Sequence, residues 1–99
     1  MVIVSGHFDV DPARRDEFIA DRLDQMRASR AEEGCIVYAF SPDPLEPGRV
    51  LLLERWESKA ALAAHIERLR SGPRPSSDVP VLGAEVLQYE IAQVGPVGS

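Results

Sequence analysis

The residue types best suited to chemistry gather around one histidine of this 99-residue chain. His65 has apolar neighbours at helical spacing: Leu62, Ile66 and Leu69. A partly buried imidazole titrates near neutral pH, so it can act as a general base, a general acid or a hydrogen-bond donor to a bound ring. The alternative is a core histidine whose ring is satisfied by a backbone carbonyl. The spacing makes His65 the first candidate for catalysis.

Two aromatic residues complete the set of candidate catalytic residues. Trp56 can line a cavity for an aromatic substrate, or it can close the core and donate its indole N–H to a carbonyl. Tyr38 belongs to a predicted strand, and its hydroxyl can reach a ligand. Weaker candidates for substrate binding are His7, Arg55 and Glu54. His7 is also typical of a surface or an interface, and Arg55 with Glu54 of a solvated or interfacial ion pair.

The element that positions these residues is a strand followed at once by a helix. Residues 50–53 form a continuous apolar run, which is typical of a strand covered on both faces. Glu54, Arg55 and Glu57 are expected to bring the chain out into solvent around Trp56 after this run. Ser58 is predicted to cap a helix, because its hydroxyl can accept from backbone N–H groups of the first turn. The alanine-rich residues 60–64 favour that helix.

The first third of the chain predicts a strand and a helix. Residues 2–10 alternate in polarity with the period of a strand, and Gly6 interrupts them as a bulge or a close contact. Asp11 is the expected N-cap of a helix over residues 12–33, which begins with a proline whose missing N–H is no loss there. Gly34 is placed to adopt the left-handed conformation after this helix.

The remaining segments complete a β-α-β-β-α-β order. Residues 35–40 are apolar and predict a strand, in which Cys35 is interpreted as a core residue. Residues 41–48 contain three prolines and a glycine and must form a turn, so the strands on either side are expected to make an antiparallel hairpin. A polar, proline-rich loop over residues 74–80 separates the second helix from a last strand over residues 81–94.

This order is typical of a ferredoxin-like α+β fold, in which an antiparallel sheet carries two helices on one face. Because the helices cover only that face, apolar residues on the other face need a second cover. The sheet of a second copy would supply it, so we expect a homodimer. We also expect one domain over residues 1–94 and a tail over residues 95–99.

Composition excludes several classes of function. The net charge of −5 argues against a surface for nucleic acid or acidic membranes, which would need a basic patch. No apolar run approaches the roughly 18 residues of a membrane helix, and the start is too short for a signal peptide, so we expect a cytoplasmic location. One cysteine and two histidines give no recognisable metal site, and no glycine-rich nucleotide loop is present. A small apolar cavity with a few polar groups remains, the usual form of a small-molecule site.

A longer motif connects these residues to a known family. The pattern E-x-W-x-S-x-x-A-L-x-x-H is found at Glu54, Trp56, Ser58, Ala61, Leu62 and His65. It resembles the antibiotic biosynthesis monooxygenase family, and the resemblance extends upstream to D-P-A-R-R-D-E-F at residues 11–18 and R-A-E-E-G-C-I-V-Y at residues 30–38. It covers about residues 2–91 and implies a small homodimeric ferredoxin-like domain, a dimeric α+β barrel.

In the monooxygenase branch, the resemblance implies oxidation of a small phenolic or quinol-type substrate by O₂ without metal, flavin or any other cofactor. The protein would deprotonate the substrate, hold the anion and exclude water. Members of that branch carry an Asn, a Trp, a Tyr and an Arg or His around the cavity, and this sequence has no Asn. The candidates that remain are His65, Trp56, Tyr38 and His7.

Other activities occur on the same fold. A non-catalytic dimeric domain that binds a small ligand, or an isomerase of signalling sugars, matches the motif as well as the oxygenase does. A haem-degrading enzyme would need the Asn of its branch and a ligating histidine beyond the second helix, whereas residues 71–80 contain no histidine. We therefore expect no specific haem binding.

Overall fold

The computed structural model describes residues 1–73 and 77–99. Its four strands are β1 (Val2–Asp9), β2 (Cys35–Pro42), β3 (Arg49–Trp56) and β4 (Gly83–Glu90). Its helices are a 3₁₀ turn, η1 (Pro12–Arg14), followed by α1 (Arg15–Ala20), α2 (Leu23–Arg30) and α3 (Lys59–Ser71). The strands form one antiparallel sheet in the order β2-β3-β1-β4. This is the predicted ferredoxin-like α+β fold.

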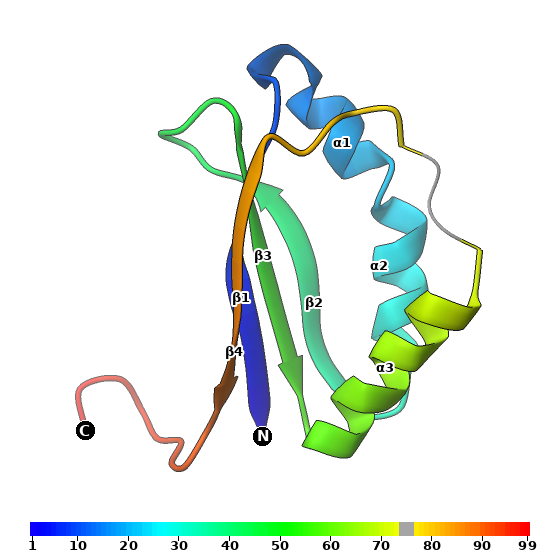
Figure 1. Cartoon of the computed structure of the whole chain (residues 1–99). Helices are drawn as coiled ribbons and strands as arrows, with labels where there is room; N and C mark the ends of the chain where they lie inside the picture. Colours follow the sequence, from blue (N-terminus) through cyan, green and yellow to red (C-terminus); the bar gives the residue numbers. More distant parts are fainter. Residues whose placement is uncertain (74–76) are drawn as a thin grey trace.

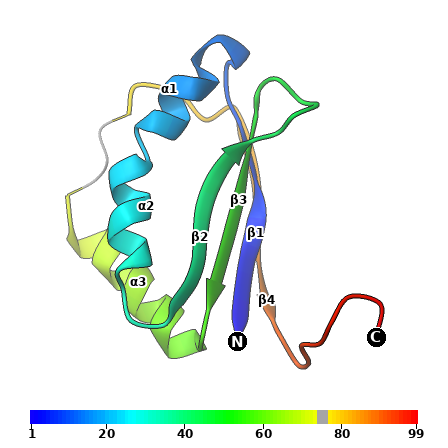
Figure 2. The same ribbon diagram turned by 180° about the vertical axis from the view of Figure 1, so that it is seen from behind.

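All of the helices lie on one side of the sheet, and both views of the ribbon show the other side bare (Figures 1 and 2). Successive side chains of a strand point to opposite faces, so every second residue of β3 faces the helices. These inward residues are Val50, Leu52, Glu54 and Trp56, and all four are buried. The hydrophobic core therefore lies between the sheet and the helices, with Phe18 of α1 and Leu62 of α3 packed into it.

The predicted helix over residues 12–33 is wrong as a single element. Its start is confirmed, because the Asp11 side chain accepts a hydrogen bond from the backbone N–H of Ala13, but the helix breaks after Ala20 and ends at Arg30. At the break, the backbone N–H of Arg22 bonds to the carbonyl of Ile19 at 3.0 Å. The carbonyl of Phe18, its α-helical acceptor, instead receives the Arg22 guanidinium at 3.3 Å. A side chain thus replaces the backbone donor there.

The two glycine predictions have clear physical explanations. Gly34 has a φ of +84°, the left-handed conformation expected for it, although it lies four residues beyond the last residue of α2. Gly6 makes a close contact and not a bulge, because the pairing of β1 with β4 is regular around it. A Cβ at position 6 would overlap the carbonyl oxygen of Glu85 on β4. Glycine is required for this approach.

The hairpin between β2 and β3 is confirmed, with Tyr38 opposite Glu54 in its register. The N-cap of the second helix is confirmed as well, because the Ser58 hydroxyl accepts from the Ala61 N–H at 3.1 Å. The last strand is shorter than the predicted residues 81–94. The predicted loop at 74–80 falls partly outside the described residues, at 74–76.

The bare face of the sheet carries large apolar side chains. Leu53 is 46% exposed, Leu87 is 50% exposed and Tyr89 is 43% exposed. The prediction that residues 50–53 are covered on both faces is therefore not met within one chain. In the part of the chain that the structure describes, no helix combines the length and apolarity required to cross a membrane.

Candidate active site

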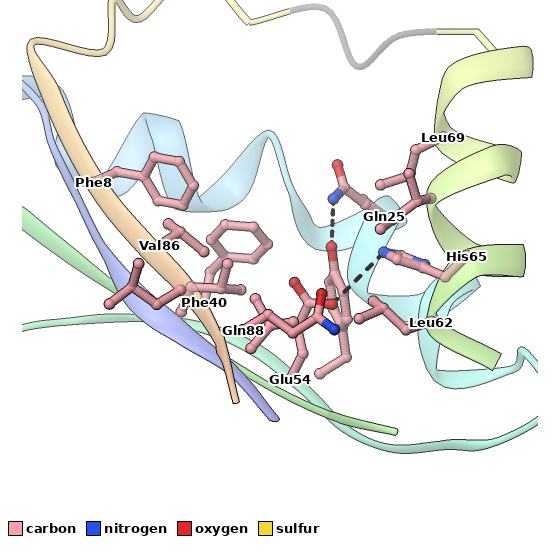
Figure 3. A pocket seen from close by; sticks show the side chains of 14 residues that line it. Phe8, Gln25, Phe40, Glu54, Leu62, His65, Leu69, Val86 and Gln88 are labelled. Carbon is pink, nitrogen blue, oxygen red and sulfur yellow. Dashed lines mark hydrogen bonds and ion pairs between the residues drawn. The ribbon is translucent and has the colours of Figure 1, made fainter. Parts of the chain in front are cut away.

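A cavity of about 340 Å³ lies between the inner face of the sheet and the helices α2 and α3. Aliphatic and aromatic side chains form most of its wall, including Phe8, Phe40 and Leu69 (Figure 3). Five polar side chains interrupt that wall: Gln25, Tyr38, Glu54, His65 and Gln88. A small ligand with an apolar body and one or two polar groups would match this lining.

His65 lies on the inner side of α3, where the periodicity of the sequence places it. It is only 3% exposed. Its ring packs against the indole of Trp56, with 4.6 Å between ring centroids, and edge-on to the phenol of Tyr38 at 5.2 Å. The structure therefore brings the three candidate catalytic residues together. Trp56 itself does not border the cavity but supports the histidine from behind.

The two nitrogens of His65 have different partners. Nδ1 is 2.8 Å from Oε2 of Glu32, which belongs to the turn after α2. Nε2 is 3.8 Å from Oε1 of Glu54, a contact that Figure 3 shows beside the cavity. Burial lowers the pKa of His65, and the charge of Glu54 opposes that shift. A neutral ring that donates from Nδ1 to Glu32 leaves the lone pair of Nε2 on the cavity side.

Glu54 differs from its prediction. The alternative that put Glu54 in solvent or in an ion pair with Arg55 is wrong, because Glu54 is only 7% exposed and points into the cavity. The reason is the alternation of β3, which puts Glu54 on the same face as Leu52 and Trp56 and puts Arg55 on the opposite face. Oε1 of Glu54 accepts the indole N–H of Trp56 at 3.0 Å. Burial raises the pKa of Glu54, while the Trp56 hydrogen bond and His65 act in the other direction. The candidacy of Glu54 for substrate binding stays a prediction.

Tyr38 reaches the cavity from β2. Its hydroxyl accepts a hydrogen bond of 2.6 Å from Nε2 of Gln25 on α2, and it keeps its own proton to donate. Burial is the main reason that its pKa is raised, so the hydroxyl stays protonated at neutral pH. It is a hydrogen-bond donor and not a base.

Two of the weaker candidates lie away from this site. His7 and Arg55 are on the bare face of the sheet, where His7 Nε2 is 3.7 Å from Oδ2 of Asp9. The structure therefore does not bring these two residues to the cavity. Nε of Arg55 is buried and has no hydrogen-bond partner among the described residues. Residues 1–73 and 77–99 contain no group of three His, Cys, Asp or Glu side chains that could hold a metal ion.

The site thus combines a buried neutral imidazole, a carboxyl group and a tyrosine hydroxyl around an apolar cavity. The sequence model of the antibiotic biosynthesis monooxygenase family matches residues 1–68, which include all three groups. The chain belongs to this family.

Two proteins are similar to this chain over two thirds of its length or more. An uncharacterised protein of Synechocystis sp. is 34% identical over 94 residues, which are 93% of this chain and 64% of that protein. YcnE of Bacillus subtilis, provisionally named a monooxygenase, is 31% identical over 67 residues, which are 68% of this chain and 70% of that protein. This chain thus spans slightly less than two thirds of the Synechocystis protein.

Solved structures agree on the fold. A protein of Deinococcus radiodurans provisionally assigned to the same family has a TM-score of 0.73 at 21% identity, with all of both chains covered. A provisionally assigned member from Nitrosomonas europaea has a TM-score of 0.70 at 16% identity, covering 94% of this chain and 100% of that one. At these identities the likeness concerns the fold alone.

Three polar residues of the site were not predicted from the sequence: Gln25, Glu32 and Gln88. Gln25 lies seven residues after Phe18, so it could have been found as a polar member of the apolar stripe of its helix. Glu32 gave no such signal, because it lies in a turn and meets His65 across 33 positions of sequence. A charged residue in a turn is ordinarily solvated.

Proposed function

We propose that this member of the antibiotic biosynthesis monooxygenase family oxidises a small phenolic or quinol-type substrate with O₂, without metal or flavin. One observation carries the proposal: the unbonded Nε2 edge of His65 lies in a cavity whose wall is otherwise mostly apolar. A neutral imidazole in that position can take the proton of a phenol that binds against it. Glu54 and the hydroxyl of Tyr38 lie beside it to hold the polar end of the substrate.

The reaction balances with O₂ as the only oxidant. The substrate O–H bond breaks, its proton moves to Nε2 of His65, and the electron-rich phenolate remains. The ring carbon opposite the oxygen then gives electrons to O₂ and forms a C–O bond. Cleavage of the O–O bond leaves one oxygen atom on the substrate as a quinone carbonyl. The other oxygen leaves as water, with the ring hydrogen and the proton that His65 returns.

The cavity wall supports this assignment by its chemistry. Phe8, Phe40 and Val86 give flat and apolar surface for a ring, as Figure 3 shows, whereas the polar groups lie toward Glu54 and His65. Exclusion of water strengthens the interaction of the anion with nearby hydrogen-bond donors and protects reactive oxygen intermediates. Trp56 and Tyr38 contribute by fixing the imidazole from two sides.

Oxygen consumption with anthrone tests the proposal, because its enol form is a phenol with a hydrogen on the ring carbon opposite the oxygen. His65→Gln and His65→Ala should each lower the rate per folded molecule by about 10²–10⁴-fold, the usual effect of losing a general base. The thermal midpoint of each variant should be measured in parallel. Full activity with a lowered midpoint would assign His65 to the core. Ligand binding without oxygen uptake by the unmodified protein would instead support a non-catalytic or isomerase-type domain.

We also propose that the protein is a homodimer whose sheets face each other. The exposed apolar side chains of the bare face support this, and so does the buried Nε of Arg55, which lacks a partner among the described residues. A second copy would cover the former and can bring an acceptor to the latter. Sedimentation at micromolar concentration should give twice the 10.9 kDa mass of one chain. A single species of that lower mass would contradict the dimer.

Haem degradation remains the least favoured activity, and a cytoplasmic location remains a prediction. Titration with haem should give no sharp stoichiometric Soret shift. A shift that disappears on replacement of His7 or His65 would overturn this expectation.

A further inference from the structure

His65 lies between two carboxylates that come from different parts of the chain. Glu32, in the turn after α2, contacts Nδ1, and Glu54, on β3, faces Nε2 at the longer distance. Of the two carboxylates, Glu32 is the one within hydrogen-bond distance of the ring. The charged and titratable groups that face the ring come from four elements: Glu32, Tyr38, Glu54 and Arg68.

The surroundings of Glu32 suit a carboxylate that keeps its charge. Its Oε1 accepts a hydrogen bond from Nε of Arg68, which lies on α3 three residues after His65. Nη2 of Arg68 donates in turn to the buried Ser29 hydroxyl at 3.2 Å. These contacts hold Glu32 by a charge-assisted hydrogen bond, which is the stronger kind. Arg68 therefore holds one oxygen of the carboxylate while the other oxygen contacts the imidazole.

A second hollow of about 190 Å³ lies beside the same histidine, and Glu32, His65 and Arg68 all border it. The Glu32 side chain keeps 17% of its surface exposed, so water solvates part of this carboxylate. Glu54 has no such support, because no arginine or lysine pairs with it among the described residues. The two carboxylates thus differ in both solvent contact and neutralising charge.

We propose that Glu32 is a positioning residue of the site, which accepts the Nδ1 proton of His65 and so keeps the lone pair of Nε2 directed at the cavity. The same carboxylate stabilises the imidazolium that forms when Nε2 takes a proton from the substrate. This inference rests on the proposed function of His65 as base. A carboxylate behind a histidine commonly fixes its tautomer and orientation in this way.

Nitrogen-15 spectra of the His65 ring, recorded across a pH titration, test the inference without turnover. The unmodified protein should show Nδ1 protonated and Nε2 unprotonated at neutral pH. Glu32→Gln removes a negative charge and should lower the pKa of His65, whereas Arg68→Gln removes a positive charge and should raise it. Opposite shifts identify an electrostatic effect on the ring, because a loss of packing alone has no reason to change sign. Glu46→Gln, which makes the same charge change in the exposed turn between β2 and β3, should leave the ring unchanged.

Kinetics supply the second readout. Glu32→Gln should lower kcat roughly 10- to 100-fold, by analogy with metal-site histidines that lose the carboxylate orienting them, with KM nearly unchanged. The acid limb of the pH profile should move down in Glu32→Gln and up in Arg68→Gln, following the pKa of His65.

Unchanged ring signals in Glu32→Gln, or shifts of the same sign in both variants, would overturn the role of Glu32. If Glu32→Gln does not fold, Arg68→Gln decides alone: a raised pKa of His65 supports the role and any other result contradicts it. Absence of oxygen uptake by the unmodified protein would count only against the proposed function, because the spectra need no turnover.

Discussion

The two faces of the sheet differ in how far their side chains are buried and hydrogen-bonded within one chain. On the inner face, β3 presents buried residues such as Val50 and Leu52, and the polar Glu54 has the Trp56 N–H as a partner. On the bare face, the same strand presents the half-exposed Leu53 and Arg55, whose buried Nε has no partner among the described residues. One strand thus contributes to a packed face and to a face whose apolar side chains stay exposed. Under the proposed dimer, folding and assembly would use separate sets of side chains.

The largest effect should come from a truncation on the inner face. Phe18 is fully buried beneath the ring of Phe8, so Phe18→Ala should lower the free energy of unfolding by about 3–5 kcal/mol. Denaturant unfolding measures this change. Leu45→Ala is the control, since Leu45 is 86% exposed and its change should stay within about 0.5 kcal/mol. Similar losses in the two variants would remove the contrast between packed and unpacked positions.

A charge on the bare face should act on assembly. Leu53→Asp would bury a carboxylate between two sheets, and we expect it to weaken the dimer by roughly 10²-fold or more, about 3 kcal/mol. Sedimentation over a concentration series gives the dissociation constant. Leu45→Asp makes the same change in an exposed turn and should leave the dimer intact. Unaltered association of Leu53→Asp would mean that the bare face is not the interface.

The pH dependence of stability should reveal the buried Glu54. Its pKa is raised in the folded state, so it favours folding at low pH, and that contribution is lost as pH rises through the raised pKa. Glu54→Gln removes the resulting penalty and keeps an acceptor for Trp56. Its thermal midpoint should exceed that of the unmodified protein at pH 7, by a margin that disappears near pH 4. Exposed Glu57→Gln should show no such trend, and a constant difference for Glu54→Gln would contradict the sign.

The smallest effect concerns the start of α3, the helix that carries His65. Ser58→Ala removes the side-chain acceptor of the Ala61 N–H and should cost about 1 kcal/mol of stability. Ser71→Ala, at the exposed end of the same helix, should cost less, because its hydroxyl bonds only the Glu67 side chain. Equal unfolding midpoints of the two variants would show that the cap contributes little.

The fold was largely predictable because its signals are local. The apolar runs, the cap at Ser58 and the proline-rich turn each depend on residues a few positions apart. The apolar stripe around His65 placed that residue correctly at the inner face. The predicted long helix over residues 12–33 was wrong although its signals are local, because the side chain of Arg22 competes with the backbone N–H for a carbonyl oxygen.

The site was less predictable because its contacts are long-range. Glu54 was expected in solvent from its polarity, although strict alternation from Val50 along β3 would have placed it inside. Glu32 meets His65 only after α2 and α3 pack together on the sheet, and no spacing in the sequence reports that contact. The role of His65 as a base, and not only as a core residue, stays a prediction that kinetic measurements can test.

The edge position of β4 affects which substitutions this domain can accept during evolution. The strand lines the cavity through Val86 and Gln88, yet it supplies none of the buried core residues among the described positions, and it pairs only with β1. Substitutions in β4 can therefore reshape one wall of the cavity with little loss of stability in the rest of the domain. Proteins that share this fold can therefore come to bind different molecules through substitutions in a single edge strand.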